Sequence, residues 1–239
     1  MIPLRDLGQR GIPVVTAALV AINIAVWVYV LTLADRPREL AAFYDAWSLR
    51  SVRLFDELRT GTLTAPSLVP LLTHEFVHAG WLHIVGNMLF LWVFGASLEA
   101  RIGRVRYLAF YLLAGLAAAL AQGTYFVLVH RTIGLVGASG AISGVLGAYL
   151  VLTPTAKVRA LVPVGLFMTP MNLPAILVLG EWVVLQIVAA LGVLGVIDAD
   201  ATNVAYFAHL GGFAFGVLVF GLARLLRRAP IGRVGVAHG

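Results

Sequence analysis

The chain has 239 residues, of which 61% are hydrophobic and 12% are charged, and its mean hydropathy is +0.95. Soluble domains usually carry about 25% charged residues, so this composition excludes an ordinary globular protein and indicates a chain that crosses a membrane several times. The sequence has no cysteine, which excludes disulfides and thiolate metal sites, and its net charge is +6. Because the basic residues lie between the apolar runs, this charge is typical of membrane orientation rather than of nucleic-acid binding.

Six apolar runs have about the length that a helix needs to cross a bilayer, roughly 20 residues. We expect membrane spans at residues 13–33, 82–98, 107–129, 134–153, 173–197 and 203–222. The predicted fold is therefore an all-α, polytopic bundle of six transmembrane helices, which forms a single domain over residues 1–239.

The segment between the first two spans, residues 34–81, is too polar to cross a membrane. Its acidic and basic residues are interleaved with aromatic ones, such as Phe43, Tyr44 and Trp47. This mixture is typical of helical pieces that lie at the level of the lipid headgroups, so we expect a membrane-embedded interfacial loop. At the other end of the chain, residues 223–239 form a basic tail.

Six spans put both termini on one side of the membrane, and most of the 17 Lys and Arg residues then lie on that side. The positive-inside rule predicts that both termini are cytoplasmic, in a plasma or inner membrane, and that residues 34–81 are extracytoplasmic. The second, fourth and sixth spans then begin near the outer surface.

Two of those span beginnings carry residues that can act together in catalysis. Ser139 opens the fourth span within Gly137-Ala138-Ser139-Gly140, and His209 lies in the sixth span. Small residues let helices approach closely, so we expect these two helices to bring the Ser139 hydroxyl within reach of the His209 imidazole. The small residues expected to pack at the site are Gly137, Gly140, Gly212 and Gly216.

The second span adds two hydrogen-bond donors, His83 and Asn87, four residues apart on one helical face. Together with the backbone N–H of Ser139, they are suited to stabilising an oxyanion. A serine with a histidine base needs no carboxylate partner to act as a nucleophile. Glu181 lies inside the fifth span toward the cytoplasmic side, and we interpret it as structural or cavity-lining. These groups predict a serine endopeptidase that works inside the membrane.

Other functions are compatible with parts of the pattern. His74, Glu75 and His78 match the H-E-x-x-H signature of helical zinc proteases, which would make the chain a metalloprotease. A transporter would show Gly/Pro-interrupted spans in matching halves, which the sequence lacks. The serine-protease interpretation needs no cofactor and no metal.

Three sequence blocks resemble the rhomboid family of intramembrane serine proteases. The first runs from His74-x-x-x-His78 through His83-x-x-x-Asn87 to Glu99-x-Arg101, the second is Gly137-Ala138-Ser139-Gly140, and the third is Ala208-His209-x-x-Gly212-x-x-x-Gly216. The resemblance covers nearly the whole chain in the order of the family. It implies Ser139 as nucleophile, His209 as general base, and an oxyanion site formed by His83, Asn87 and the Ser139 backbone.

The resemblance also implies substrates and surroundings. The expected substrates are single-span transmembrane proteins whose helix is locally weak, and the other expected contact is with membrane lipid; no nucleic-acid partner and no particular oligomeric state is predicted. Two positions depart from the family pattern. The aromatic residue that often follows the nucleophile by four positions is Ser143 here, and the Trp–Arg pair of the first loop is replaced by Trp47 and Arg50, three residues apart.

Ser143 supports one alternative from another functional class, a catalytically silent rhomboid-like protein that binds membrane clients. The pair in Glu99-x-Arg101 is expected to fix the cytoplasmic end of the second span.

Overall fold

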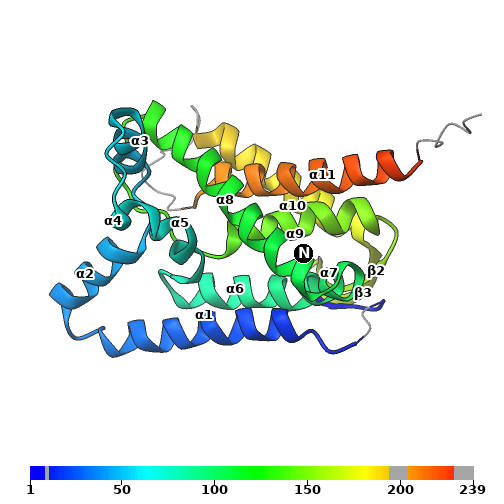
Figure 1. Ribbon diagram of the computed structural model, residues 1–239. Coiled ribbons are helices and arrows are strands. Elements are labelled where there is room, and N and C mark those ends of the chain that lie inside the picture. Colours follow the sequence, from blue (N-terminus) through cyan, green and yellow to red (C-terminus); the bar gives the residue numbers. More distant parts are fainter. Residues whose placement is uncertain (9–10, 194–203, 229–239) are drawn as a thin grey trace, which may run out of the picture.

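The computed structural model describes residues 1–8, 11–193 and 204–228 (Figure 1). In this part of the chain, five helices are long and apolar enough to cross a membrane, and a shorter apolar helix accompanies them. The predicted helical, polytopic membrane bundle is therefore confirmed. Residues 194–197 and 203 of the predicted fifth and sixth spans, and 229–239 of the predicted tail, lie outside the described residues.

A helix occurs in each predicted span. They are α1 (Val14–Thr32), a continuous helical stretch made of α6 (Trp81–Phe90), η2 (Leu91–Gly95) and α7 (Ala96–Ile102), then α8 (Arg104–Leu128), α9 (Ser139–Leu152), α10 (Ala175–Val193) and α11 (Tyr206–Arg228). The segment η2 is a π-helical turn within the second span. The helix α11 extends past the predicted end of its span into the segment expected to be a tail.

The helix α9 is shorter than the apolar run that contains it. The run was expected to cross the membrane from residue 134, but the helix begins only at Ser139 and has 14 residues. At 1.5 Å per residue it is about 21 Å long, less than the ~30 Å hydrocarbon core of a bilayer. Ser139 is therefore approached by a non-helical segment, residues 130–138.

Small residues let α9 pack deeply between α8 and α11. A β-carbon on Gly212 would overlap the carbonyl oxygen of Gly140, and one on Gly216 would overlap that of Gly144. On the opposite side, a β-carbon on Gly140 would lie 2.6 Å from the Cβ of Ala118 in α8. The backbones of α9 and α11 thus touch directly, as the glycine spacing predicts.

Glu99 joins α7 to the beginning of α1. Its carboxylate accepts hydrogen bonds from the backbone N–H groups of Val15 (2.9 Å) and Thr16 (2.8 Å), and from the Thr16 hydroxyl (2.8 Å). A carboxylate is favourable there because the first N–H groups of a helix have no intrahelical partner. Glu99 thus has a structural role, but its partners are the N-terminus of α1 and, at 4.0 Å, Arg104. The expectation that Glu99 and Arg101 act as a pair at this end of the second span is corrected, because the contacts of Glu99 are with Val15, Thr16 and Arg104.

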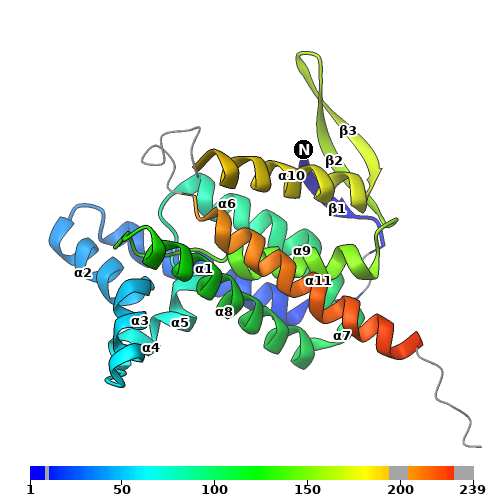
Figure 2. The same ribbon diagram turned by 90° about the horizontal axis from the view of Figure 1, so that it is seen from above.

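A three-stranded antiparallel sheet adds to the helices and corrects the strictly all-α expectation. Its strands are β1 (Ile2–Asp6), β2 (Lys157–Val164) and β3 (Phe167–Pro174), in the order β1-β2-β3. Residues 173 and 174, expected to begin the fifth span, belong to β3. The hairpin β2–β3 projects from the bundle beside α10, and its tip residue Leu166 is 98% exposed (Figure 2).

The two ends of the bundle differ in character (Figure 1). One end carries the short helices of the long polar loop, which are α2 (Pro37–Trp47), α3 (Ser51–Thr60), α4 (Ala65–Leu68), α5 (Pro70–Thr73) and η1 (His74–Phe76). The opposite end carries the sheet, α7 and the end of α11. This division separates the segments that the charge pattern assigns to opposite sides of a membrane.

Candidate active site

The loop in front of Ser139 is fixed by the polar first loop. Leu49 and Leu135 exchange both of their backbone hydrogen bonds at 3.0 Å, and the N–H of Gly137 donates to the carbonyl of His74 at 2.8 Å. Gly137 has a φ of +117°, a conformation that favours glycine. The chain can therefore turn sharply and begin α9 at Ser139, whose side chain is half-buried at the helix N-terminus.

His83 and Asn87 of α6 face this turn. A β-carbon on Gly137 would lie 2.5 Å from Nε2 of His83 and 3.7 Å from Nδ2 of Asn87. Asn87 is buried, and its Nδ2 lies 2.9 Å from Nε2 of His78, a hydrogen bond that fixes the amide. The structure thus brings His83, Asn87 and the N-terminus of α9 together, which is the arrangement expected of an oxyanion site.

The residues of the H-E-x-x-H signature do not form a helical metal site. The short helix η1 ends at Phe76, and Val77 is extended (φ −93°, ψ 136°), so His74 and His78 do not share a helical face. The ring of His74 bonds instead to the carbonyl of Pro70 at 2.7 Å, and that of His78 bonds to Asn87. Burial lowers the pKa of both histidines to about 4, so they are neutral supports of the loop. The described residues contain no cluster of three metal-binding side chains.

His209 lies in the first turn of α11, and α8 fixes the backbone there. The buried Gln122 of α8 accepts a hydrogen bond from the N–H of Ala208 at 3.0 Å, through its Oε1. Ala208 lies beside the beginning of α9, because a β-carbon on Gly140 would be 3.9 Å from the Cβ of Ala208. The beginning of α9, which carries Ser139, therefore lies beside the beginning of α11, which carries His209.

Two side chains of α10 contact the imidazole of His209. Nδ1 of His209 lies 2.7 Å from Oε1 of Gln186, and the Trp182 ring is centred 5.8 Å from the imidazole. Trp182 and Gln186 are four residues apart, on one face of α10. Tyr206, on α11 itself, is centred 6.5 Å from the ring.

Ser143, which replaces an aromatic residue of the family pattern, turns inward on its own helix. Its hydroxyl donates to the carbonyl of Ser139 at 2.6 Å, and the residue is 1% exposed. Trp182 of α10 thus lies against His209, where the family pattern has an aromatic residue of α9. Gln186, Gln122 and Trp182 are not among the site residues predicted from the sequence, which offered no carboxylate as a third catalytic group. For the two glutamines, an amide inside an apolar run is the signal that could have found them.

Glu181 forms an ion pair at 3.0 Å with the amino group of Met1. This contact agrees with the structural interpretation of Glu181. The group is partly exposed, and its partner lies at the sheet end of the bundle (Figure 2).

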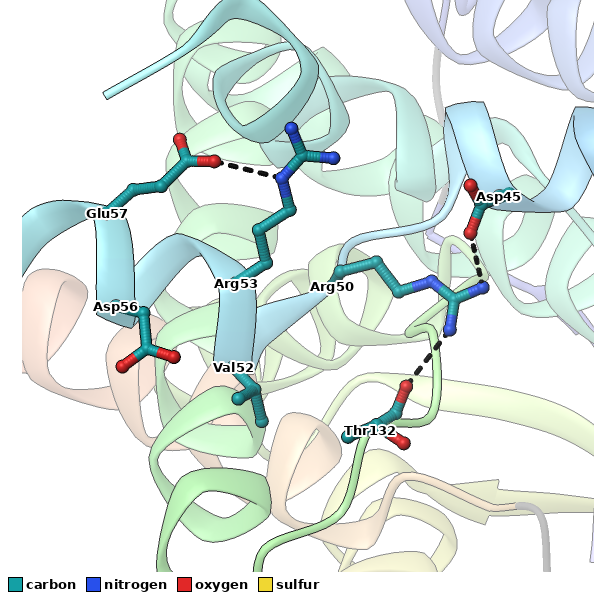
Figure 3. A pocket seen from close by; sticks show the side chains of 7 residues that line it. All are labelled: Asp45, Arg50, Val52, Arg53, Asp56, Glu57 and Thr132. Carbon is teal, nitrogen blue, oxygen red and sulfur yellow. Dashed lines mark hydrogen bonds and ion pairs between the residues drawn. The ribbon is translucent and has the colours of Figure 1, made fainter. Parts of the chain in front are cut away.

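An open pocket of about 480 Å³ lies between the first loop and Thr132, and most of the side chains that line it are charged (Figure 3). Neither Ser139 nor His209 lines it. Within it, Arg50 bonds to Asp45 at 2.7 Å and to the carbonyl of Thr132 at 3.0 Å. Arg53 bonds to Glu57 at 2.9 Å, a contact that lowers the pKa of Glu57 to about 2. Arg50 thus joins the first loop to the segment before Ser139.

The fold and the site define a multi-pass membrane protein with a serine and a histidine at a glycine-lined contact between two helices. Residues 65–225 match the Rhomboid domain family. The chain belongs to the rhomboid family.

Curated relatives agree with this assignment. The chain is 33% identical over 167 residues to presenilin-associated rhomboid-like protein A, mitochondrial, of Danio rerio, which covers 68% of the chain and 40% of that protein. It is 33% identical over 154 residues to rhomboid protein 1, mitochondrial, of Saccharomyces cerevisiae (64% and 41%), and 29% identical over 239 residues to RHOMBOID-like protein 1 of Arabidopsis thaliana (90% and 54%). The match thus spans about half or less of each of these relatives.

Proposed function

We propose that the protein is an intramembrane serine endopeptidase in which Ser139 is the nucleophile and His209 the general base. The observation that carries this proposal is the contact between Gly140 and Gly212, which sets the beginning of α9 against the first two turns of α11. His83 and Asn87 of α6 face Gly137, two residues before Ser139.

The residues can perform the reaction in two stages. The Ser139 hydroxyl gives its proton to Nε2 of His209 while its oxygen attacks the peptide carbonyl. Donors from His83, Asn87 and the Ser139 backbone stabilise the oxyanion. The imidazolium then protonates the leaving amine, and water hydrolyses the acyl-enzyme with His209 again as base.

The proposed substrate is a single-span membrane protein with a locally weak helix. A stable transmembrane helix protects its peptide bonds because every backbone group is hydrogen-bonded within the helix. Cleavage requires a segment that can leave this state, which small or helix-breaking residues favour. The proposed setting is a plasma or inner membrane, with both termini cytoplasmic and the site opening to the extracytoplasmic side.

The test is cleavage of such a reporter by purified protein in lipid vesicles. We expect Ser139→Ala and His209→Ala to abolish cleavage, while Ser143→Ala, a neighbouring serine on the same helix, retains it. If Ser139→Ala and His209→Ala both still cleave the reporter, the assignment is wrong. A silent client-binding protein would bind the reporter without cutting it. A zinc protease would lose activity to a chelator, and His74→Ala would impair it more than His209→Ala.

A further inference from the structure

We propose that Gln186 of α10 is a positioning residue that holds His209 in the tautomer and orientation needed of a general base. This inference rests on the proposed function. The observation behind it is the hydrogen bond of 2.7 Å between Nδ1 of His209 and Oε1 of Gln186.

The chemistry of the base fixes the direction of this hydrogen bond. A neutral imidazole has one protonated and one unprotonated nitrogen. To accept the Ser139 proton through Nε2, His209 must carry its own proton on Nδ1. An amide oxygen at Nδ1 accepts that proton in a hydrogen bond and so favours the competent tautomer. A carboxylate has this role in serine–histidine–aspartate triads.

Gln186 differs from a carboxylate in having no charge. Its oxygen orients the ring but gives the imidazolium less stabilisation than a carboxylate would. An ionised acid would also be costly inside a membrane, whereas an amide is tolerated there. The pair thus combines orientation of the base with a low cost of burial.

The packing around the pair supports a positioning role. Trp182, one turn away on α10, flanks the imidazole. Gln122 fixes the backbone of the same turn through Ala208, so the ring and the main chain are held by two different amides. The titratable groups near His209 in the described part of the chain are His83, which interacts with it electrostatically, and Tyr206.

The test compares Gln186→Leu, Gln186→Glu and a matched control, Gln122→Leu, in the vesicle assay. A neutral hydrogen bond stabilises by an amount that corresponds to roughly tenfold in rate. We expect Gln186→Leu to lower kcat by about tenfold with little change in KM. Gln186→Glu keeps the acceptor, so it should recover kcat and move the acid limb of the pH profile upward by about one unit, because a carboxylate favours the imidazolium. Gln122→Leu should lower thermal stability without moving that limb.

The inference is overturned if Gln186→Leu keeps the parental kcat. It is also overturned if both Gln186 variants lose activity equally and the acid limb stays in place. If Gln186→Leu does not fold, the Gln186→Glu pH profile and the ¹⁵N shifts of the His209 ring in Ser139→Ala protein still decide the question. A ring protonated on Nδ1 supports the inference, and a ring protonated on Nε2 contradicts it.

Failure of this inference can be told from failure of the proposed function. If Ser139→Ala cleaves like the parent, the proposed function fails. If Ser139→Ala is inactive while the Gln186 variants cleave like the parent, only the role of Gln186 fails.

Discussion

Gly137 is the single residue on which the geometry beside Ser139 most depends. Its φ of +117° is one that an L side chain rarely adopts, and a β-carbon there would lie 2.5 Å from Nε2 of His83. The residue therefore serves both the turn into α9 and the space that His83 occupies.

We predict that Gly137→Ala reduces cleavage severely. The strained backbone costs about 1–2 kcal/mol of stability, and the new methyl group displaces His83 from the proposed oxyanion site. Gly61→Ala is the matched control, since Gly61 has a φ of +70° but no atom within 4 Å of the added carbon. Thermal unfolding should show a loss in both variants, larger in Gly137→Ala, and only Gly137→Ala should lose kcat. Equal activity of the two variants would show that the contact with His83 is unimportant.

Glu75 is a buried carboxyl group that the proposed reaction does not use. It has no exposed surface, and neither oxygen has a hydrogen-bond partner in the described part of the chain. It packs against Gly115 of α8, and burial raises the pKa of Glu75 well above its ordinary value. Burial therefore favours the protonated, neutral form of Glu75 in the folded protein.

This shift predicts a pH dependence of stability with a definite sign. Burial raises the pKa of Glu75 in the folded protein. The contribution of Glu75 to the free energy of unfolding is therefore fully present below the unfolded-state pKa of about 4.5, and it falls as the pH rises above that value. We expect Glu75→Gln to raise the melting temperature at pH 8 and to differ little from the parent near pH 4, measured by differential scanning fluorimetry. Glu57, whose pKa is lowered, should behave in the opposite way, so Glu57→Gln should destabilise at neutral pH. A lower melting temperature for Glu75→Gln at pH 8 would contradict this account.

At the scale of elements, the contact between α9 and α11 decides whether the proposed catalytic pair can form. Gly216 lies against the backbone of α9, whereas a β-carbon on Gly221, further along α11, would have open space. The two glycines thus give the same substitution in two environments on one helix.

We predict that Gly216→Ala destabilises the protein and lowers activity, while Gly221→Ala does neither. Overpacking a close contact typically costs 1–3 kcal/mol, which exceeds the gain of about 1 kcal/mol from replacing glycine in a helix. Gly221→Ala keeps only that gain. Thermal unfolding and reporter cleavage measured side by side would check this. Equal melting temperatures would mean that the helices can separate without loss.

The membrane helices could be predicted from the sequence, because a long uncharged run has no stable alternative to a helix in lipid. The strand β2 was missed although Val158 and Ala160 are buried and Lys157 and Arg159 exposed, the period-2 pattern of a strand. The residues that follow them are apolar and lead toward the predicted fifth span, so the pattern is short and easily attributed to the start of a helix.

The candidate site was predictable only in part. Spacing within a helix relates residues such as His83 and Asn87, so their shared face on α6 could be expected, whereas the contact of this face with Gly137 is seen only in the fold. Spacing within one helix does not determine which face of α10 packs against α11. Gln186 lies 23 residues from His209 in the chain, and only the packing of the two helices reveals the hydrogen bond between them.

At the scale of the whole molecule, the segments are divided between two ends of the bundle. The first loop and the approach to Ser139 lie at one end, and the sheet lies at the other (Figure 1). In the orientation that we propose from the positive-inside rule, the first end is extracytoplasmic. Leu63, in the first loop, and Leu166, at the hairpin tip, are both exposed and mark the two ends.

We predict that these two leucines label from opposite sides of the membrane. The chain has no cysteine, so Leu63→Cys and Leu166→Cys each introduce a single thiol. A membrane-impermeant maleimide should modify Leu63→Cys in intact cells and Leu166→Cys only after permeabilisation. Labelling of the two positions from the same side, or in the reverse order, would show that the proposed orientation is wrong.

The central claim, that Ser139 is activated by His209 in a site between α9 and α11, is tested most directly by covalent labelling. Purified protein is treated with a fluorophosphonate, and the modified residue is located by peptide mass spectrometry. We predict one adduct, on Ser139, which is lost in Ser139→Ala and strongly reduced in His209→Ala. An adduct that persists in Ser139→Ala, or an unmodified Ser139 in protein that cleaves its reporter, would contradict the account.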